Sequence, residues 1–295
     1  MGDGPGGVET PEPFVDREER PRNPAGRIRF GHPDFALRVA VGGARDPRDR
    51  VGRFFVSDNR GHTWSGPYRF PGLDDDPRLR GLVMTSRTDY LVTGPRSALI
   101  LMSAVDPQLG DLSGRLDKPF AVRTEDGGRN FEFLSWVVPW SDPHRAVMPS
   151  TLQQPNGEIV TALRRRNPRS LAEPNWIDLY VSPDGGVSWS LRSRVTETGI
   201  GNGNPPALVS LPDGRLACAY GHRDLRQMCL RLSGDGGRHW SRQIVIRSIP
   251  FDRDLGYPRM AVNPRGELVL SYYLATRRRP HSHIEAALFD PPQSR

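Results

Sequence analysis

The stretch Ser182-Pro183-Asp184-Gly185-Gly186-Val187-Ser188-Trp189 indicates the fold of this chain, because variants of it occur three more times. The other copies lie at residues 57–64, 124–131 and 233–240. Every copy has Ser or Thr first, Asp or Asn third, Gly fifth and Trp or Phe eighth. The closing aromatic residues are 67, 58 and 51 residues apart, a recurrence that indicates a repeat architecture.

Each copy has the chemistry of a tight turn between two strands. Glycine supplies the positive φ that such a turn needs, and the Asp side chain can accept hydrogen bonds from the amides of its own turn. The closing Trp or Phe is expected to pack beneath the turn. We therefore interpret the four segments as structural and place no catalytic residue on them.

A second repeat lies out of phase with the first. Gly157, Gly214 and Gly266 each stand eight residues after a proline, and each is flanked by apolar residues. This pattern predicts a strand, a turn and a second strand. The turn segment then follows a third strand, and a fourth strand leaves it. Four short antiparallel strands in roughly 50 residues are the unit of a β-propeller blade. Third strands are predicted at residues 52–56, 120–123, 177–181, 228–232 and 284–289.

Composition agrees with an all-β protein. The chain has 29 Pro and 31 Gly among 295 residues, and no stretch shows sustained helical periodicity. The length suits one propeller domain, predicted at residues 28–295, after a disordered Gly/Pro/charged arm at residues 1–27. No run of 18 apolar residues predicts a membrane span. The arm has no apolar stretch typical of a secretion signal, so we expect a cytoplasmic protein.

The net charge of +7 does not by itself indicate nucleic-acid binding. Lys118 is the only lysine among 41 basic residues, which points to a genome-wide preference for arginine. A phosphate-binding face would appear as a clustered stripe, and only residues 164–166 and 277–279 form runs. We expect a monomer without nucleic-acid or membrane partners, metal or cofactor. Cys218 and Cys229 lie on adjacent predicted strands, where two buried free thiols are favoured over a disulfide.

The repeated turn segment resembles the Asp box, and the chain resembles the sialidase superfamily over roughly residues 50–292. The further segments that carry this resemblance are 87–90, 148–151, 162–166, 176–180, 203–206, 220–223, 254–259 and 271–273. The resemblance implies a β-propeller of the sialidase type with six blades, although only five third strands are recognisable. The sixth is expected within residues 1–43 or outside this chain, unless the ring closes with five. An N-terminal strand is expected to complete the last blade.

Strand direction predicts where a site would lie. Strands alternate in direction within a blade, so the glycine turns and the Asp boxes share one face. The opposite face collects the segments that lead into each first strand and those that follow each second strand. Arg166 and Arg223 both stand nine residues after a turn glycine and are equivalent. A ring of arginines there would bind an anion. The candidates on this face are Arg87, Asp89, His144, Arg166, Asn204, His222, Arg223, Asp254, Tyr257, Arg259, Tyr272 and Tyr273.

The resemblance implies roles for these residues. Sialidases hold the substrate carboxylate with three arginines, for which Arg87, Arg223 and Arg259 are the candidates here. They use a tyrosine nucleophile, a recognised exception to the two-carboxylate rule, and the candidates are Tyr257, Tyr272 and Tyr273. The candidates for the acid are Asp89 and Asp254. The family's Phe-Arg-Ile-Pro motif is absent, and a glutamate partner for the tyrosine is restricted to Glu173 or Glu285.

Three functions follow from this pattern. The first is a sialidase-like glycoside hydrolase that releases a terminal acidic sugar from a glycan. The second is a related hydrolase or lyase acting on another anionic saccharide, in which His222 or His144 would serve as a base. The third is a non-catalytic propeller that binds a glycan or a protein at the same face.

Overall fold

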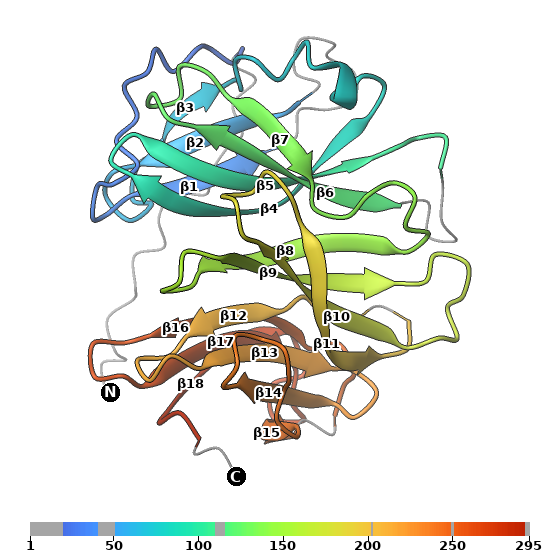
Figure 1. The fold of residues 1–295 in the computed structure, drawn as a ribbon. Coiled ribbons are helices and arrows are strands. Elements are labelled where there is room, and N and C mark those ends of the chain that lie inside the picture. The colour runs from blue at the N-terminus through green and yellow to red at the C-terminus, as the bar shows by residue number, and fades with distance from the viewer. Residues whose placement is uncertain (1–19, 41–50, 110–115, 202, 249–250, 293–295) are drawn as a thin grey trace.

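Five antiparallel sheets make up the fold in a computed structural model, which describes residues 20–40, 51–109, 116–201, 203–248 and 251–292. Figure 1 shows them in chain order, from β1–β3 (blue) to β16–β18 (red). Blade 1 contains β1 (Ala36–Ala40), β2 (Arg53–Ser57) and β3 (Ser65–Tyr68), and a short helix, η1 (Pro77–Leu79), follows it. Blade 2 contains β4 (Val83–Gly94), β5 (Ser97–Val105), β6 (Asp117–Thr124) and β7 (Glu132–Trp136). Blade 3 contains β8 (Arg145–Gln153), β9 (Ile159–Arg166), β10 (Asn175–Ser182) and β11 (Ser190–Gly199).

Blade 4 contains β12 (Ala207–Ser210), β13 (Leu216–His222), β14 (Gln227–Ser233) and β15 (Ile244–Ser248), and blade 5 contains β16 (Gly256–Val262), β17 (Leu268–Leu274) and β18 (His283–Phe289). The protein is therefore an all-β, five-bladed β-propeller, and the prediction of six blades is wrong for the described residues. All five predicted third strands are confirmed, as β2, β6, β10, β14 and β18.

All four Asp boxes share the same hydrogen-bonding pattern. In the third box, the Ser182 hydroxyl donates to Asp184 Oδ1 at 2.8 Å and accepts from the N–H of Gly186 at 2.8 Å. Asp184 Oδ1 also accepts from the N–H of Ser188 at 2.9 Å. The first box has Asn59 in the Asp position, and its Oδ1 accepts from the N–H of Thr63 at the same 2.9 Å. Asn serves because the turn needs only an oxygen acceptor, which both side chains provide.

The other predicted turns are confirmed as well. Gly157, Gly214 and Gly266 have φ values of +86°, +84° and +83°, a backbone region that favours glycine. The pairing of Ile159 with both Gln153 and Ser182 places the glycine turn and the box of blade 3 at the same end of the sheet. At the opposite end, which we call the mouth, first and third strands begin and second and fourth strands end.

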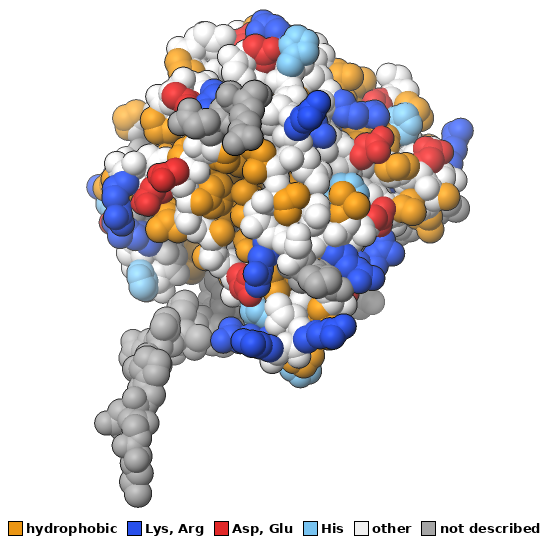
Figure 2. Space-filling model, turned by 90° about the horizontal axis from the view of Figure 1, so that it is seen from below, with side chains coloured by type: hydrophobic (Ala, Val, Ile, Leu, Met, Phe, Trp, Pro, Cys, Tyr) orange, Lys and Arg blue, Asp and Glu red, His pale blue; other side chains and the backbone are white. Residues whose placement is uncertain are grey.

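Apolar packing between neighbouring blades holds the propeller together. Four hydrophobic clusters of the described residues lie between blades 1 and 2, 2 and 3, 3 and 4, and 4 and 5. No such cluster of described residues joins blade 5 to blade 1. Instead, the outer face of β18 is open, with Ile284 79% and Leu288 56% exposed. Figure 2 views the molecule from the side of blades 4 and 5 and shows hydrophobic side chains gathered there.

The strand expected to complete blade 5 from the N-terminal part is not found among the described residues, since that sheet contains only β16, β17 and β18. Residues 1–19 of the predicted arm lie outside the described residues. Ordered contacts start before residue 28, however, because the N–H of Arg22 donates to the carbonyl of Pro67 at 3.1 Å. Arg22 also forms an isolated β-bridge with Tyr68 on β3.

The structure also bears on the thiols, on membrane spans and on metal groups. Cys218 and Cys229 lie on β13 and β14 and are buried free thiols, as predicted. Among the described residues, no helix is both long and apolar enough to cross a membrane. In the same part of the chain, no group of three or more His, Cys, Asp or Glu side chains is placed to hold a metal ion.

Candidate functional site

The innermost strands of three blades are irregular at the same position near the mouth. The pairing register shifts between Thr85 and Asp89 in β4, between Val147 and Ser150 in β8, and between Gly256 and Arg259 in β16. Bulges of this kind bend a strand and redirect its side chains, and they often lie beside functional sites. The three irregular segments, together with the residues before β12, surround one cavity.

This central cavity has a volume of about 260 Å³ and receives residues from four successive blades. Met148 and Tyr257 both line it with a positive φ, of +59° and +50°. Non-glycine residues rarely adopt this conformation, and such strain is concentrated at functional sites. The lining residues are Arg87, Thr88, Met148, Pro149, Pro205, Pro206, Tyr257, Pro258 and Arg259.

Three of the predicted site residues therefore meet in the central cavity, namely Arg87, Tyr257 and Arg259. Arg87 forms an ion pair with the fully buried Asp117, whose Oδ1 lies 3.3 Å from Arg87 Nη1. The Arg259 guanidinium has no hydrogen bond or ion pair within the described part of the chain. Its charge is thus available to a bound anion.

A second group of predicted residues lies beside the cavity. The Tyr273 hydroxyl donates to Asp254 Oδ1 at 2.6 Å and accepts from Arg223 Nη2 at 2.9 Å. Arg223 Nη2 also forms a 2.9 Å ion pair with Asp254. Burial, followed by the hydrogen bond to Asp254, raises the pKa of Tyr273 to about 12. The ring centroids of Tyr273 and Tyr257 are 5.8 Å apart, which connects this group to the cavity.

Asp89 is half-buried and follows Thr88, which lines the cavity. Burial raises the pKa of its carboxyl to about 6, and Arg259 is among the groups that oppose the rise. Asp89 Oδ2 accepts a 2.6 Å hydrogen bond from the N–H of Thr151 on the neighbouring blade. A carboxyl with this pKa can hold a proton in mildly acidic solution and donate it.

Asn204 was predicted to bind substrate. In the structure, its side chain instead holds the backbone of Leu255 and Tyr257 in position. The side chain is fully buried, and its Nδ2 donates to the carbonyl of Leu255 at 3.1 Å. Its Oδ1 accepts from the N–H of Tyr257, also at 3.1 Å. Gly256 lies against it with no room for a side chain, because a Cβ there would come within 1.5 Å of Asn204 Oδ1. Asn204 thus fixes the strained backbone that presents Tyr257 to the cavity.

Further arginines add positive charge to the mouth. Arg164 is buried, and that burial, with the nearby Arg145 charge as the next cause, lowers its pKa to about 10. Arg166 and Arg223 contribute in the same direction. Arg166, a predicted binding residue, is itself buried and does not line the central cavity. The arginine ring therefore surrounds the cavity but only part of it faces a ligand.

Some predicted residues lie elsewhere. Tyr272 is packed in the apolar interface between blades 4 and 5, because consecutive residues of β17 point to opposite faces of the sheet. His222 does not line the cavity, and its Nδ1 accepts from the N–H of Leu225. Glu173 and Glu285 line two other cavities. The carboxylate beside Tyr273 is thus Asp254, whereas Glu285 lies opposite the buried Tyr272 in the strand pairing.

Two contributors to the site escaped the sequence analysis. Asp117 begins a third strand 30 residues from Arg87, and no motif links it to the mouth. Met148 lies within a segment that carried the family resemblance, but an apolar residue gives no signal of a site. The proline repeat does indicate the position of the site, because all three of its prolines line the cavity: Pro149, Pro206 and Pro258.

Comparison with known proteins decides the family. The sequence profile of the BNR repeat-like domain family matches residues 35–270, which is most of the chain. The chain belongs to this family. A comparison with curated protein sequences gives no match for this BNR repeat-like protein.

Solved structures share the propeller of this BNR repeat-like protein. A Dyadobacter fermentans protein of unknown function is 21% identical, with a TM-score of 0.63, covering 82% of this chain and 64% of its own. The Fusarium graminearum GH93 α-L-arabinofuranosidase is 17% identical, with a TM-score of 0.56 and coverages of 70% and 63%. A Hadza microbial sialidase is 13% identical, with a TM-score of 0.56 and coverages of 80% and 49%. The chain spans less than two thirds of each of these proteins, and the similarity shows the fold alone.

Proposed function

We propose that this protein is a glycoside hydrolase that releases a terminal acidic sugar from a glycan. The observation that carries the proposal is the meeting of Arg87, Arg259 and Tyr257 in one cavity, with the Tyr273, Asp254 and Arg223 group beside it. The cavity volume of about 260 Å³ suits a single sugar residue, since it is just below the roughly 300–1,000 Å³ of typical ligand pockets. Removal of a terminal residue fits that size better than internal cleavage.

An anionic sugar is favoured by charge. A guanidinium binds a carboxylate with two parallel hydrogen bonds, and the two arginines that line the cavity present this group. Arg259 has no competing partner in the described residues, and Arg164 adds a buried positive charge nearby. Arg87 already has Asp117 as a counter-ion, so a neutral sugar would leave the Arg259 guanidinium without a hydrogen-bonded one among the described residues.

The tyrosine pair supports covalent catalysis. Tyr273 is the candidate nucleophile because its hydroxyl already donates to a carboxylate that can take the proton. As the Tyr273 oxygen bonds to the anomeric carbon, its proton passes to Asp254 and the glycosidic bond breaks. Asp89 protonates the departing oxygen, and water then hydrolyses the sugar from Tyr273, returning both protons. A neutral phenol suits this site, because it does not repel the substrate carboxylate.

The test is a panel of 4-methylumbelliferyl glycosides: an α-sialoside, a β-glucuronide and an α-L-arabinofuranoside. The proposal expects fluorescence release from at least one acidic glycoside and its loss in Arg259→Ala. Arg265→Ala is the matched control, because that exposed arginine lies on the glycine turn at the end of blade 5 opposite the mouth. Turnover of the neutral arabinofuranoside alone would contradict the acidic specificity. Saturable binding of acidic sugars without turnover of any substrate would contradict the hydrolase.

A further inference from the structure

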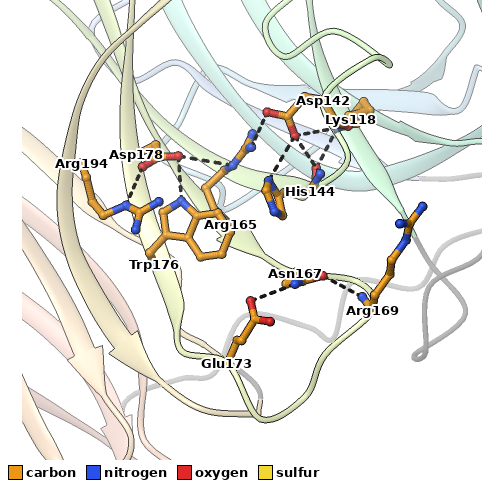
Figure 3. A network of polar contacts seen from close by, with 10 residues as sticks. All are labelled: Lys118, Asp142, His144, Arg165, Asn167, Arg169, Glu173, Trp176, Asp178 and Arg194. Atoms are coloured by element: carbon orange, nitrogen blue, oxygen red, sulfur yellow. Dashed lines mark hydrogen bonds and ion pairs between the residues drawn. The ribbon is translucent and has the colours of Figure 1, made fainter.

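A second cavity, of about 400 Å³, opens at the mouth between blades 2 and 3. Its residues come from the loop before β8, the end of β9, the loop before β10, β10 itself and the fourth strand β11. Figure 3 shows the polar network that frames it. We call it the side cavity, and its lining residues are Asp142, His144, Arg165, Glu173, Pro174, Trp176, Asp178, Tyr180, Leu191, Arg194 and Glu197.

Arg165 is the buried charge of the side cavity. It follows Arg164 on β9, so the two guanidinium groups lie on opposite faces of one sheet. Arg165 is only 2% exposed, and its Nη2 forms a 2.7 Å ion pair with Asp142. Its Nη1 has no hydrogen-bond partner among the described residues. Buried donors are almost always paired in folded proteins, so this one is open to an acceptor supplied from outside the chain.

The frame around Arg165 is rigid. Asp178 accepts from the indole N–H of Trp176 at 2.7 Å and lies 3.5 Å from Arg194 Nε, while the Arg194 guanidinium stacks 4.7 Å from the Trp176 ring centroid. On the other side, Lys118 Nζ donates to the carbonyls of Asp142 at 2.6 Å and His144 at 2.7 Å. Side chains fixed in this way form a preorganised site.

Unused hydrogen-bonding groups line the same cavity. Within the described part of the chain, the Tyr180 hydroxyl and the Glu197 carboxylate have no hydrogen-bond partner. Glu173 is held in place by Asn167 Nδ2 at 2.8 Å, which leaves one of its oxygens unoccupied. The cavity thus offers donors and acceptors together, the arrangement that matches hydroxyl groups, which both donate and accept.

Charge selects against an acidic ligand here. Four carboxylates line the side cavity, from Asp142, Glu173, Asp178 and Glu197, against the two guanidinium groups of Arg165 and Arg194. The central cavity has the opposite balance, with two arginines and no lining carboxylate among the described residues. An anionic ligand is therefore disfavoured in the side cavity.

We propose that the side cavity binds a neutral sugar, separately from the acidic sugar assigned to the central cavity. Both cavities open at the mouth of the propeller, so one branched or extended glycan could present residues to each. The binding site itself does not depend on hydrolysis at the central cavity, and it is tested without turnover.

The experiment is an NMR titration of the ¹⁵N-labelled protein with lactose, arabinobiose or N-acetylneuraminate. The indole N–H signal of Trp176, identified by its absence in Trp176→Phe, reports on the side cavity because this group contacts Asp178. Lactose or arabinobiose is expected to shift it in a saturable way. Tyr180→Phe and Glu197→Gln each remove one ligand contact and should weaken the neutral sugar about 3- to 10-fold. Glu125→Gln, in a box at the opposite end, is the matched control.

Three results would overturn the proposal: no saturable shift with either neutral disaccharide, a stronger response to N-acetylneuraminate, or unchanged affinity in both side-cavity variants. Arg259→Ala should leave the titration unaltered, because this arginine lies in the central cavity. If the wild type turns over no glycoside but still binds the neutral sugar in a saturable way, the hydrolase fails and the side-cavity site stands.

Discussion

The Tyr273 hydroxyl donates a 2.6 Å hydrogen bond to Asp254, while Tyr272, the preceding residue of the same strand, is buried on the other face of the sheet. This relationship gives a matched pair of variants. One tyrosine has a carboxylate partner near a cavity, and the other packs against neighbouring leucines in the interface between blades 4 and 5.

Tyr273→Phe is expected to lower kcat by a factor of about 10² or more, since it removes the nucleophile and leaves its base without a proton to accept. Tyr272→Phe should retain most of the activity, because that hydroxyl takes no part in the site. Steady-state kinetics on the acidic glycoside that turns over best checks both variants. Equal losses in the two would show that the tyrosines act through stability alone.

The raised pKa of Asp89 leads us to expect that stability and activity depend on pH. Because burial raises the pKa of Asp89 to about 6, the folded protein keeps a proton between about pH 4 and 6 that the unfolded chain has released. This group's contribution to stability is therefore present at low pH and is lost as the pH rises through 6. Activity that needs a protonated Asp89 should also decline as the pH rises through about 6.

Asp89→Asn tests both effects. The amide oxygen of Asn can still accept from the N–H of Thr151, so the fold should persist. We expect thermal denaturation to lose the part of its pH slope that belongs to this group, and hydrolysis to fall sharply at every pH. A variant with wild-type activity and an unchanged pH profile would remove Asp89 from the mechanism.

Asn204 and Gly256 should be sensitive to substitution, because the side chain of one fills the space beside the other. Asn204→Ala leaves the N–H of Tyr257 without its partner and removes one of two donors to the carbonyl of Leu255, which keeps Arg223 Nε at 3.4 Å. The unpaired N–H should cost about 1–3 kcal/mol if it stays buried. Gly256→Ala introduces a direct clash. Chemical denaturation measures both, with Gly234→Ala as the control, since a Cβ there meets nothing within 4 Å.

Lys118 is expected to be the least reactive amine of the chain. It is fully buried, its Nζ donates to two carbonyl oxygens, and burial lowers its pKa to about 8. Acylation followed by mass spectrometry should leave Lys118 unmodified in the folded protein and modify it in denaturant. Lys118→Met should destabilise the fold by about 1–3 kcal/mol for each buried acceptor left unpaired. Rapid acylation of the folded protein would contradict this burial.

Local chemistry explains why the blades could be predicted from the sequence. The boxes and the glycine turns need particular residues at fixed spacing, such as Asp184 and Gly157, so each third strand was located. The absence of a sixth blade among the described residues could not be foreseen from these signals. They count the hairpins that are present, and the expectation of six came from the family resemblance.

The site was predictable only in part. Strand direction identified the mouth, and with it Arg87, Tyr257 and Arg259. It did not separate Tyr272 from Tyr273, and it selected Arg166 although Arg165 lines the side cavity. Neighbouring residues on a strand face opposite sides, and the register depends on packing. Asp117 was missed for a different reason, since its ion pair with Arg87 joins segments 30 residues apart.

The central claim is that the arginines of the central cavity recognise a substrate carboxylate. The most direct measurement compares kcat/KM for an acidic 4-methylumbelliferyl glycoside and its methyl ester, in the wild type and in Arg259→Ala. Hydrogen bonds to charged groups contribute about 1.5–3 kcal/mol, so the wild type should prefer the acid by roughly 10- to 100-fold, and Arg259→Ala should lose most of that preference. Equal turnover of acid and ester by the wild type, or an unchanged preference in Arg259→Ala, would contradict the claim.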